Sequence, residues 1–442
     1  MARGPRIQVS KGPFRSRRLE NDFIGVMETI GWPEVDDINC FGLNNGSMRL
    51  LKYMSPEGQR QDTAPTYLHP RLEDGQHPYL HVLVESQVER VLFKGKKAIS
   101  VSFRPNLGYH PNTGLDSIRE VKARRLVTLT GGSMFSPLIL QRSGIGDPKV
   151  LNEAGVPIIV DVPGVGADYE DHNTMMYPYN SSLRPDETLD SLYSSRTGLD
   201  VMIAEKHEML NYGDKPLTII SPVACFPGDS SFLGSGQFLT LVTFTLYLFS
   251  RGHLYITGPK IDDIEDFNPE LLSDRDNLDV KAHIWIYKKQ REIAHHMGLL
   301  CRDPVPDTQP TFPAHSNANL DNLNAEYSAD DDEIIEKWVR ERIDSTWHPI
   351  GTCKMAPRDK HGVVDSALNV YGVQGLKVAD LSISPHNVGA NTCNTAMTVA
   401  EKAADIIISN EAWALSVWLL CPIAVSTCQN SGYMSVALIR ST

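Results

Sequence analysis

The chain has 442 residues, of which 41% are hydrophobic and 22% charged, and its 42 Lys plus Arg against 54 Asp plus Glu give a net charge of −12. This composition is typical of a globular protein of two or three domains and excludes a disordered, fibrous or collagen-like chain. The acidic balance argues against a nucleic-acid partner, because such proteins carry a basic surface that faces phosphate. The seven cysteines form no CxxC pair and indicate neither a disulfide framework nor a zinc ribbon.

The ends of the chain carry no clear export or membrane signal. Residues 1–20 contain six basic residues, but no apolar run follows that could serve as a signal-peptide core. The apolar stretch 412–425 is shorter than the roughly 20 residues of a membrane-spanning helix, and Pro422 interrupts it. The last three residues, Arg440-Ser441-Thr442, are not an SKL-type peroxisomal signal. We therefore expect no membrane association and no secretion.

The first half of the chain predicts strands that alternate with a helix. From His81 to Phe103, β-branched and polar residues alternate around the turn at 94–96, which is typical of a β-hairpin. Residues 124–130 form a short apolar strand, two glycines follow, and a helix is predicted to begin at Pro137 and to end at Gly144. This strand, turn and helix are half of a βαβ unit.

The second half predicts a sheet and two further helices. Residues 185–313 are loop-rich but contain strand-like stretches such as 238–249, which indicate a second, sheet-containing domain. Four acidic residues after Ser328 begin a capped amphipathic helix over 330–343. Residues 394–408 have helical spacing. Together with buried strands predicted at 157–161 and 376–380, these elements predict a mixed α/β fold.

The simplest cofactor and metal motifs are missing. No GxxxxGK[ST] occurs, and the two GxG pairs at 144–146 and 164–166 lack the third glycine and the strand-to-helix setting of a dinucleotide fingerprint. The pair His295-His296 and the histidines at 69, 77 and 81 lack the carboxylate or cysteine partners of a metal site. We expect surface or loop positions for these histidines and no bound metal.

Two longer segments are specific when taken together. The first is 131–172, GGSMFSPLILQRSGIGDPKVLNEAGVPIIVDVPGVGADYEDH, and the second is 345–405, with STWHPIGTCKM, LKVADLSISP and NTCNTAMTVAEKAAD. In these segments the chain resembles the glucose-methanol-choline (GMC) flavoprotein oxidoreductases, and among them the fungal alcohol (methanol) oxidases. SRGHLYITGP at 250–259, IWIYKKQRE at 284–292 and NVYGVQGLKVADLSISPHNVGANT at 369–392 extend the resemblance to residues 5–408.

The resemblance implies a FAD-binding α/β domain that is interleaved along the chain with a sheet-based substrate domain. The implied parts are 1–75 (substrate and FAD-covering region), 76–175 (FAD domain), 176–344 (substrate domain), 345–408 (FAD domain with the catalytic residues) and 409–442 (an atypical tail). It also implies FAD as cofactor, a small primary alcohol and O2 as substrates, and an aldehyde and H2O2 as products.

Two residues are implied to be catalytic. His348, in Trp347-His348-Pro349, matches the active-site histidine of the family. An alcohol releases hydride readily only as its hydroxyl proton leaves, and a histidine with an ordinary pKa of roughly 6.5 can accept that proton. Asn391 matches the second active-site position, where a neutral amide can hydrogen-bond the substrate oxygen without competing for the proton. Without the motif, these residues would be a packed histidine and a helix cap.

Further residues are implied to contact FAD. Val88 matches a position that meets the adenine. Ala379 and Asp380 match a position near the pyrophosphate and ribityl chain, and Asn391 and Thr392 match positions beside the flavin ring. Trp347 is also implied to contact FAD. The alternatives stay open: Val88 can be only a strand residue, and Asp380 only a cap at the end of a strand.

The chain departs from the family in three places. The family begins with a strand and a GxGxxG loop that holds the FAD pyrophosphate, and this sequence starts after that region. From Asn410 onward, the sequence matches nothing expected of the family. It is also shorter near 305–325. We therefore expect an N-terminally truncated product, or one whose coding sequence is wrongly assigned, with weak flavin binding.

Three functions follow as alternatives. The first is a FAD-dependent alcohol oxidase that is inactive if the truncation is real; the second is a FAD-containing cyanohydrin lyase of the same superfamily; the third is a non-catalytic fragment. The pocket residues cannot be assigned from the sequence, so methanol, longer alkanols and aromatic alcohols stay open. The resemblance implies a homo-oligomer and a peroxisomal location, and a cytoplasmic location otherwise.

Overall fold

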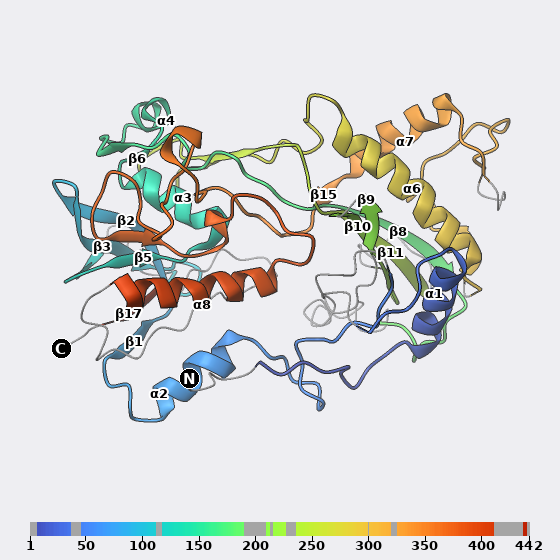
Figure 1. Cartoon of the computed structure of the whole chain (residues 1–442), viewed down its shortest axis with the longest axis horizontal. Helices are drawn as coiled ribbons and strands as arrows, with labels where there is room; N and C mark the ends of the chain where they lie inside the picture. Colours follow the sequence, from blue (N-terminus) through green and yellow to red (C-terminus); the bar gives the residue numbers. More distant parts are fainter. Residues whose placement is uncertain are drawn as a thin grey trace.

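The computed structural model describes residues 7–36, 46–111, 117–189, 209–212, 215–226, 236–298, 300–319, 325–410 and 436–439. They form two regions that lie side by side (Figure 1). We call one the α/β region, which holds β2–β7, α3, α4, β16 and α8. The other is the sheet–helix region, which holds β8–β11, β14, β15, α1, α6 and α7.

The α/β region is built from three small sheets and three helices. The first sheet is antiparallel and consists of β2 (Ser86–Lys94), β3 (Lys97–Pro105) and β4 (Arg119–Lys122). In the second sheet, β5 (Val127–Leu129) pairs in parallel with β16 (Leu376–Val378). In the third sheet, β6 (Ile145–Gly146) pairs in parallel with β7 (Val160–Asp161). The helices are α3 (Gly132–Arg142), α4 (Pro148–Glu153) and α8 (Cys393–Asn410). Since β5 and β16 are distant in sequence, their pairing confirms that this region is interleaved with the other.

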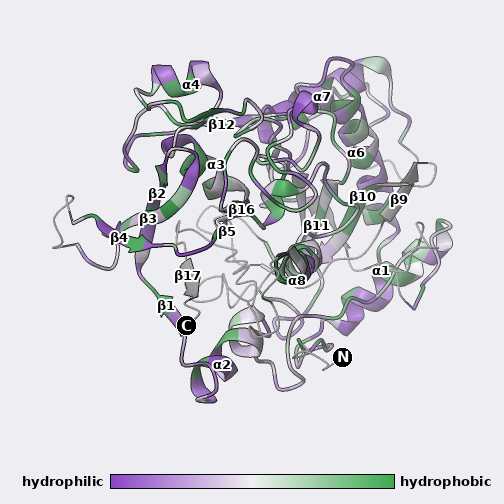
Figure 2. Cartoon of the chain, turned by 60° about the vertical axis from the view of Figure 1, so that its left-hand side comes forward, coloured by the Kyte–Doolittle hydropathy of each residue, from purple (hydrophilic) through white to green (hydrophobic). Residues whose placement is uncertain are grey.

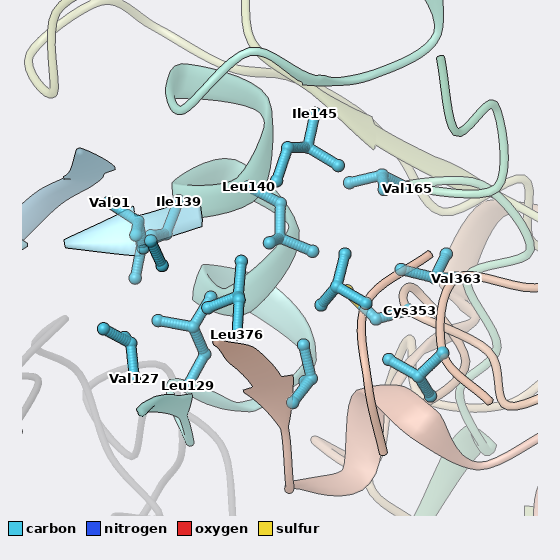
Figure 3. Close-up of a cluster of buried hydrophobic side chains, with 14 of the residues drawn as sticks. Val91, Val127, Leu129, Ile139, Leu140, Ile145, Val165, Cys353, Val363 and Leu376 are labelled. Atoms are coloured by element: carbon cyan, nitrogen blue, oxygen red, sulfur yellow. The ribbon is translucent and has the colours of Figure 1, made fainter. Parts of the chain in front are cut away.

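The core of the α/β region includes the apolar residues of β5 and β16, whose middle residues, Thr128 and Lys377, are polar. The apolar side chains of both strands are buried, together with Val91, Leu140 and Ile145 (Figure 3). Burial of one such side chain stabilises the fold by about 1.5–3 kcal/mol.

The sheet–helix region has a larger, antiparallel sheet. Its strands are β8 (Asn173–Ser181), β9 (Met209–Tyr212), β10 (Lys215–Val223), β11 (Phe238–Thr245), β14 (Leu300–Pro304) and β15 (Asp344–Ser345), in the order β14-β8-β11-β10-β9 with β15 beside β8. Helices α1 (Arg17–Thr29), α6 (Leu278–His296) and α7 (Ala329–Arg342) lie against it (Figure 1). Helix α7 is largely hydrophilic (Figure 2), and its buried Ile335 and Val339 join the core.

Smaller elements connect these parts. They are η1 (Ala64–Leu68), α2 (His69–Glu73), β1 (Leu80–Leu83), β12 (His253–Tyr255), β13 (Asp266–Asn268), η4 (Arg358–Lys360), η5 (Leu381–Ile383) and β17 (Val436–Ile439). Strand β1 pairs with β17 and β12 with β13. Among the described residues, no helix is long and apolar enough to cross a membrane, and no group of three His, Cys, Asp or Glu could hold a metal ion.

Most sequence-based predictions of elements are confirmed, but several boundaries shift. The strand predicted at 157–161 is only β7 (Val160–Asp161), and the hairpin predicted from His81 begins at Ser86. The hairpin forms as β2 and β3, and Ser328 caps α7 by accepting from the amide of Asp331. Helix α3, however, begins at Gly132 and contains Pro137 instead of starting there. Because proline has no N–H, the carbonyl of Ser133 loses its helical donor, and Thr352 Oγ1 donates to it instead (2.7 Å).

Helix α6 is a feature that periodicity did not predict, since residues 185–313 read as loop-rich. His295 and His296 lie in its last turn, where His296 is exposed, as expected for a surface position. Of the tail predicted at 409–442, residues 411–435 and 440–442 lie outside the described residues. The mixed α/β fold is confirmed, and the five domain bounds stay predictions.

Candidate active site

The candidate active site lies where the two regions meet. Strand β15 pairs with β8 in the sheet, and the chain then turns at Trp347, whose φ is +59°. Five residues after His348, the amide of Cys353 donates to the carbonyl of Ser382 in η5 (2.8 Å). The segment that carries His348 is therefore tied to the sheet at one end and to the α/β region at the other.

Asp171 fixes the backbone of this segment. Its Oδ1 accepts from the amide of His348 (2.9 Å), and its Oδ2 accepts from the hydroxyls of Ser345 and Tyr169. Burial raises the pKa of Asp171, although these donors act in the opposite direction. A carboxylate that accepts several hydrogen bonds from one segment holds that segment rigidly, so the position of His348 is set before any ligand arrives.

His172 contacts the ring of His348 directly. The two Nδ1 atoms are 2.9 Å apart, and the other ring nitrogen of His172, Nε2, lies 3.0 Å from the carbonyl oxygen of Val388. His172 is fully buried and stacks on Phe244, with ring centroids 5.6 Å apart. The phenyl ring of Phe244 also meets His348 edge-on at 5.7 Å.

Glu170 holds the loop that leads to Asn391. Its Oε2 accepts from the amide of Asn387 (3.0 Å), and its Oε1 pairs with Arg251 (3.0 Å) and His386 (3.4 Å). Burial raises the pKa of Glu170, and Arg251 opposes this shift. Consecutive residues 170, 171 and 172 thus hold both segments of the site.

The predicted catalytic residues are placed on neighbouring segments. Asn391 comes three residues after Val388, the residue that His172 binds, and directly precedes Thr392, whose carbonyl accepts from Ala396 in the first turn of α8 (2.9 Å). Trp347 precedes His348 and is 62% exposed. The roles of these residues in catalysis and in flavin contact stay predictions.

Asp380 and Val88 have clear structural roles. Asp380 caps η5 through the amide of Ser382 (2.8 Å), and its carboxylate also accepts from the amide of Gly132 (3.0 Å) and the hydroxyl of Ser136 (2.6 Å). Burial raises the pKa of this carboxyl group. Val88 is buried in β2 and, like Ala379, belongs to the α/β core. Contacts of Val88, Ala379 and Asp380 with FAD stay predictions.

The residues at the carboxyl ends of β5 and β16 fit a dinucleotide such as FAD. Ligands of parallel α/β sheets bind at this edge, where helix N-termini meet. A Cβ built on Gly132, whose φ is +75°, would meet no atom within 4 Å, so the backbone before α3 is open. The buried hydroxyl of Ser133 lies at the same edge and has no hydrogen-bond partner in the described part of the chain. This orphaned hydroxyl fits the presence of a polar ligand.

The sequence-based site omitted residues 169–172. They end the first quoted motif, DYEDH, but were not assigned a role. The available signal was five titratable residues in a row, directly before a stretch without charged residues that forms β8. Their buried positions show that they support the site, because buried charged groups are rare unless they are paired.

The fold and the site together are those of a flavin-dependent oxidoreductase. Two models of the family described as GMC oxidoreductase match residues 5–174 and 249–400. The alcohol oxidase of Pichia angusta is 32% identical over 91% of this chain and 73% of its own length, and that of Candida boidinii is 31% identical over 91% and 74%. The chain belongs to the GMC oxidoreductase family, whose members are FAD-dependent and act on CH–OH donors.

Solved structures share the fold. A FAD-dependent oxidoreductase from Chaetomium thermophilum matches with a TM-score of 0.70 at 24% identity, and covers 88% of this chain and 72% of its own. Formate oxidase from Aspergillus oryzae matches with a TM-score of 0.73 at 18% identity, and covers 92% and 73%. These matches confirm the fold class.

Proposed function

We propose that this chain oxidises a small, uncharged primary alcohol to the aldehyde, with dioxygen reduced to hydrogen peroxide. The observation that carries the proposal is His348, held through its backbone by Asp171 and through its ring by His172, beside the loop that leads to Asn391. The similarity to two fungal alcohol oxidases supports the substrate class. When bound, FAD supplies the acceptor for the hydride of the carbinol carbon and passes the electrons to dioxygen.

His348 takes the hydroxyl proton in this proposal. The alcohol proton must leave as the C–H bond breaks, and a fixed imidazole within hydrogen-bond reach is suited to accept it near neutral pH. Asp171 and His172 prevent the side chain from moving away. A general base held in this way typically contributes a factor of about 10²–10⁴ to the rate.

Asn391 orients the substrate oxygen. Its side-chain amide can donate a hydrogen bond to that oxygen and does not titrate, so the proton goes to His348 alone. Trp347, Ala379, Asp380, Thr392 and Val88 are the residues that would hold the cofactor. Asp380 can do so through its backbone while its carboxylate remains bound to Gly132 and Ser136.

The sheet face beside His348 favours an uncharged substrate. Phe244 of β11 contacts His348. Side chains alternate between the two faces of a strand, so the register of β8 and β11 gives the residues on the same sheet face as Phe244. These include Thr174, Met176, Pro178, Thr240 and Val242. None of these is charged. A cationic alcohol such as choline, the substrate named for a bacterial relative that is 28% identical, would require a carboxylate or an aromatic cage.

The test is the visible absorption spectrum of the purified chain with FAD, followed by anaerobic addition of methanol or ethanol. We expect a bound-flavin spectrum that bleaches, and one H2O2 per aldehyde when air is admitted. His348→Gln should slow the bleaching. Its matched control is His315→Gln, since His315 is exposed and distant in sequence from the site. Bound flavin that stays oxidised while a cyanohydrin is cleaved would instead indicate the lyase. A folded chain that takes up no FAD would indicate the non-catalytic alternative.

The same resemblance supports a homo-oligomeric, peroxisomal enzyme. An oxidase that releases H2O2 is best placed in a compartment that removes it. Light scattering of the purified chain measures its mass, for which a value of 49.1 kDa would contradict the oligomer. Co-localisation of the tagged protein with a peroxisomal marker tests its location.

A further inference from the structure

We infer that His172 is a positioning residue that sets the tautomer of His348, so that Nε2 of His348 carries the lone pair. The use of that lone pair to accept the substrate proton rests on the proposed function. The tautomer itself does not, because it follows from hydrogen bonds within the chain.

The first step is the bond between His172 and Val388. A backbone carbonyl can only accept a hydrogen bond, so Nε2 of His172, 3.0 Å from the oxygen of Val388, must carry a proton. A neutral imidazole has only one N–H, and Nδ1 of His172 therefore has a lone pair. The bond to one ring nitrogen thus decides the state of the other.

The second step is the contact between the two rings. Nδ1 of His172 and Nδ1 of His348 are 2.9 Å apart, a distance that requires one proton between them. Since His172 presents a lone pair, the proton belongs to Nδ1 of His348. Nε2 of His348 is then the unprotonated nitrogen, which is the state that a base needs.

The surroundings keep His172 neutral. Its ring is fully buried against Phe244, and burial disfavours an imidazolium. The two carboxylates that precede it in the chain bind other groups: Asp171 accepts from the backbone amide of His348 and from the hydroxyls of Ser345 and Tyr169, and Glu170 binds Arg251, His386 and the amide of Asn387.

The backbone also prevents the two rings from separating. The amide and the hydroxyl of Thr346 both donate to the carbonyl of His172, at 2.9 and 2.7 Å. The relative position of residues 172 and 348 is therefore fixed independently of the ring contact. A histidine in water favours the Nε2–H tautomer, which would place a proton where the base needs a lone pair.

Two substitutions separate the two bonds of His172. In His172→Asn, the side-chain oxygen is at about the position of Nδ1 and can still accept from His348, whereas the bond to Val388 is lost. In His172→Gln, the amide reaches about the position of Nε2 and can still donate to Val388, whereas the acceptor for His348 is lost. If His172 only fills space, the two variants should behave alike.

The tautomer is read directly from long-range ¹H–¹⁵N spectra of the full chain labelled with ¹⁵N-histidine, with His348 assigned from its loss in His348→Gln. We expect the Nδ1–H form of His348 in the wild type and in His172→Asn, and the Nε2–H form in His172→Gln. An Nε2–H form of His348 in the wild type would overturn the inference, even if no variant of His172 folds.

Kinetics then connect the tautomer to catalysis. We expect kcat for alcohol oxidation to fall about 100-fold in His172→Gln with KM unchanged, the scale for a misplaced catalytic group, and to stay near the wild-type value in His172→Asn. Equal losses in both variants would contradict the positioning role. If the wild type shows the expected tautomer but oxidises no alcohol, the proposed function fails and the inference about His172 stands.

Discussion

Two buried polar side chains, Gln141 in the α/β region and His283 in the sheet–helix region, are satisfied to different degrees. In the α/β region, Gln141 is fully buried and uses its whole amide: Nε2 donates to the carbonyls of Val165 (3.0 Å) and Leu254 (3.2 Å), and Oε1 accepts from Ile256 (2.8 Å). In the sheet–helix region, the ring nitrogens of His283 and the hydroxyl of Tyr287 are buried with no hydrogen-bond partner in the described part of the chain.

The difference teaches which contacts must be precise. The groups that hold η5 and the segment of His348 must be precise, because catalytic groups tolerate displacements of only about 0.5 Å. Directional hydrogen bonds supply that precision. Around His283 on α6, apolar and aromatic packing dominates, among residues such as Tyr177, Tyr287 and Trp338, and an unpaired polar atom there costs stability without moving the site.

The largest effect is expected from exchanging a histidine of the site. His348→Gln should lower the rate of flavin reduction by alcohol about 10³-fold, since the general base is lost, and leave the free energy of unfolding nearly unchanged. Stopped-flow absorbance and urea unfolding measure the two quantities. His283→Leu, in the other region, should leave the rate intact. Equal rates for His348→Gln and wild type would remove His348 from the mechanism.

The next effect concerns the network of Gln141. A Cβ on Gly166, whose φ is +80°, would lie 2.2 Å from the carbonyl oxygen of Leu254 and 2.4 Å from Nε2 of Gln141. Gly166→Ala should therefore cost about 3–5 kcal/mol from the clash and the left-handed backbone together. Gly155→Ala is the matched control, because Gly155 also has a positive φ (+67°) but open space around it. It should cost only about 1–2 kcal/mol in urea unfolding.

Acid should reveal His283, which has no hydrogen-bond partner among the described residues. Burial lowers the pKa of His283 from 6.5 to about 3, so the unfolded state binds its proton first as the pH falls. His283 therefore lowers stability by about 1.4 kcal/mol per pH unit below pH 6.5, until the pH reaches its folded pKa. His283→Leu should remove this slope. Urea unfolding at pH 7 and pH 5.5 measures it, and an unchanged slope would contradict the assignment.

The smallest effect compares two buried tyrosines. The hydroxyl of Tyr287 has no partner within the described residues, whereas that of Tyr179 donates to Gln290 Oε1 (2.9 Å). Tyr287→Phe should raise the free energy of unfolding by about 1 kcal/mol, and Tyr179→Phe should lower it by a similar amount. Changes of the same sign in both variants would show that the two hydroxyls are not in different environments.

Local sequence patterns determined the elements whose stability is local. Alternation predicted the β2–β3 hairpin, and Ser328 with the acidic residues after it predicted α7. Helix α6 was missed because four polar residues, Asp279, His283, Gln290 and Arg291, are buried and interrupt the apolar stripe. Arg291 can be buried there because it donates to the carbonyls of Ala318 and Asn319 and to the hydroxyl of Tyr327.

The sequence by itself determined the family and predicted His348 and Asn391 as catalytic residues, because their motifs are contiguous and specific. Only the tertiary structure showed that residues 170–172 support both segments of the site. Helical and strand periodicity report on neighbours within a few residues, whereas the contacts of His172 with His348 and Val388 join residues 176 and 216 positions apart. Such contacts form only when the sheet and the α/β region fold against each other, and they leave no periodic pattern in the chain.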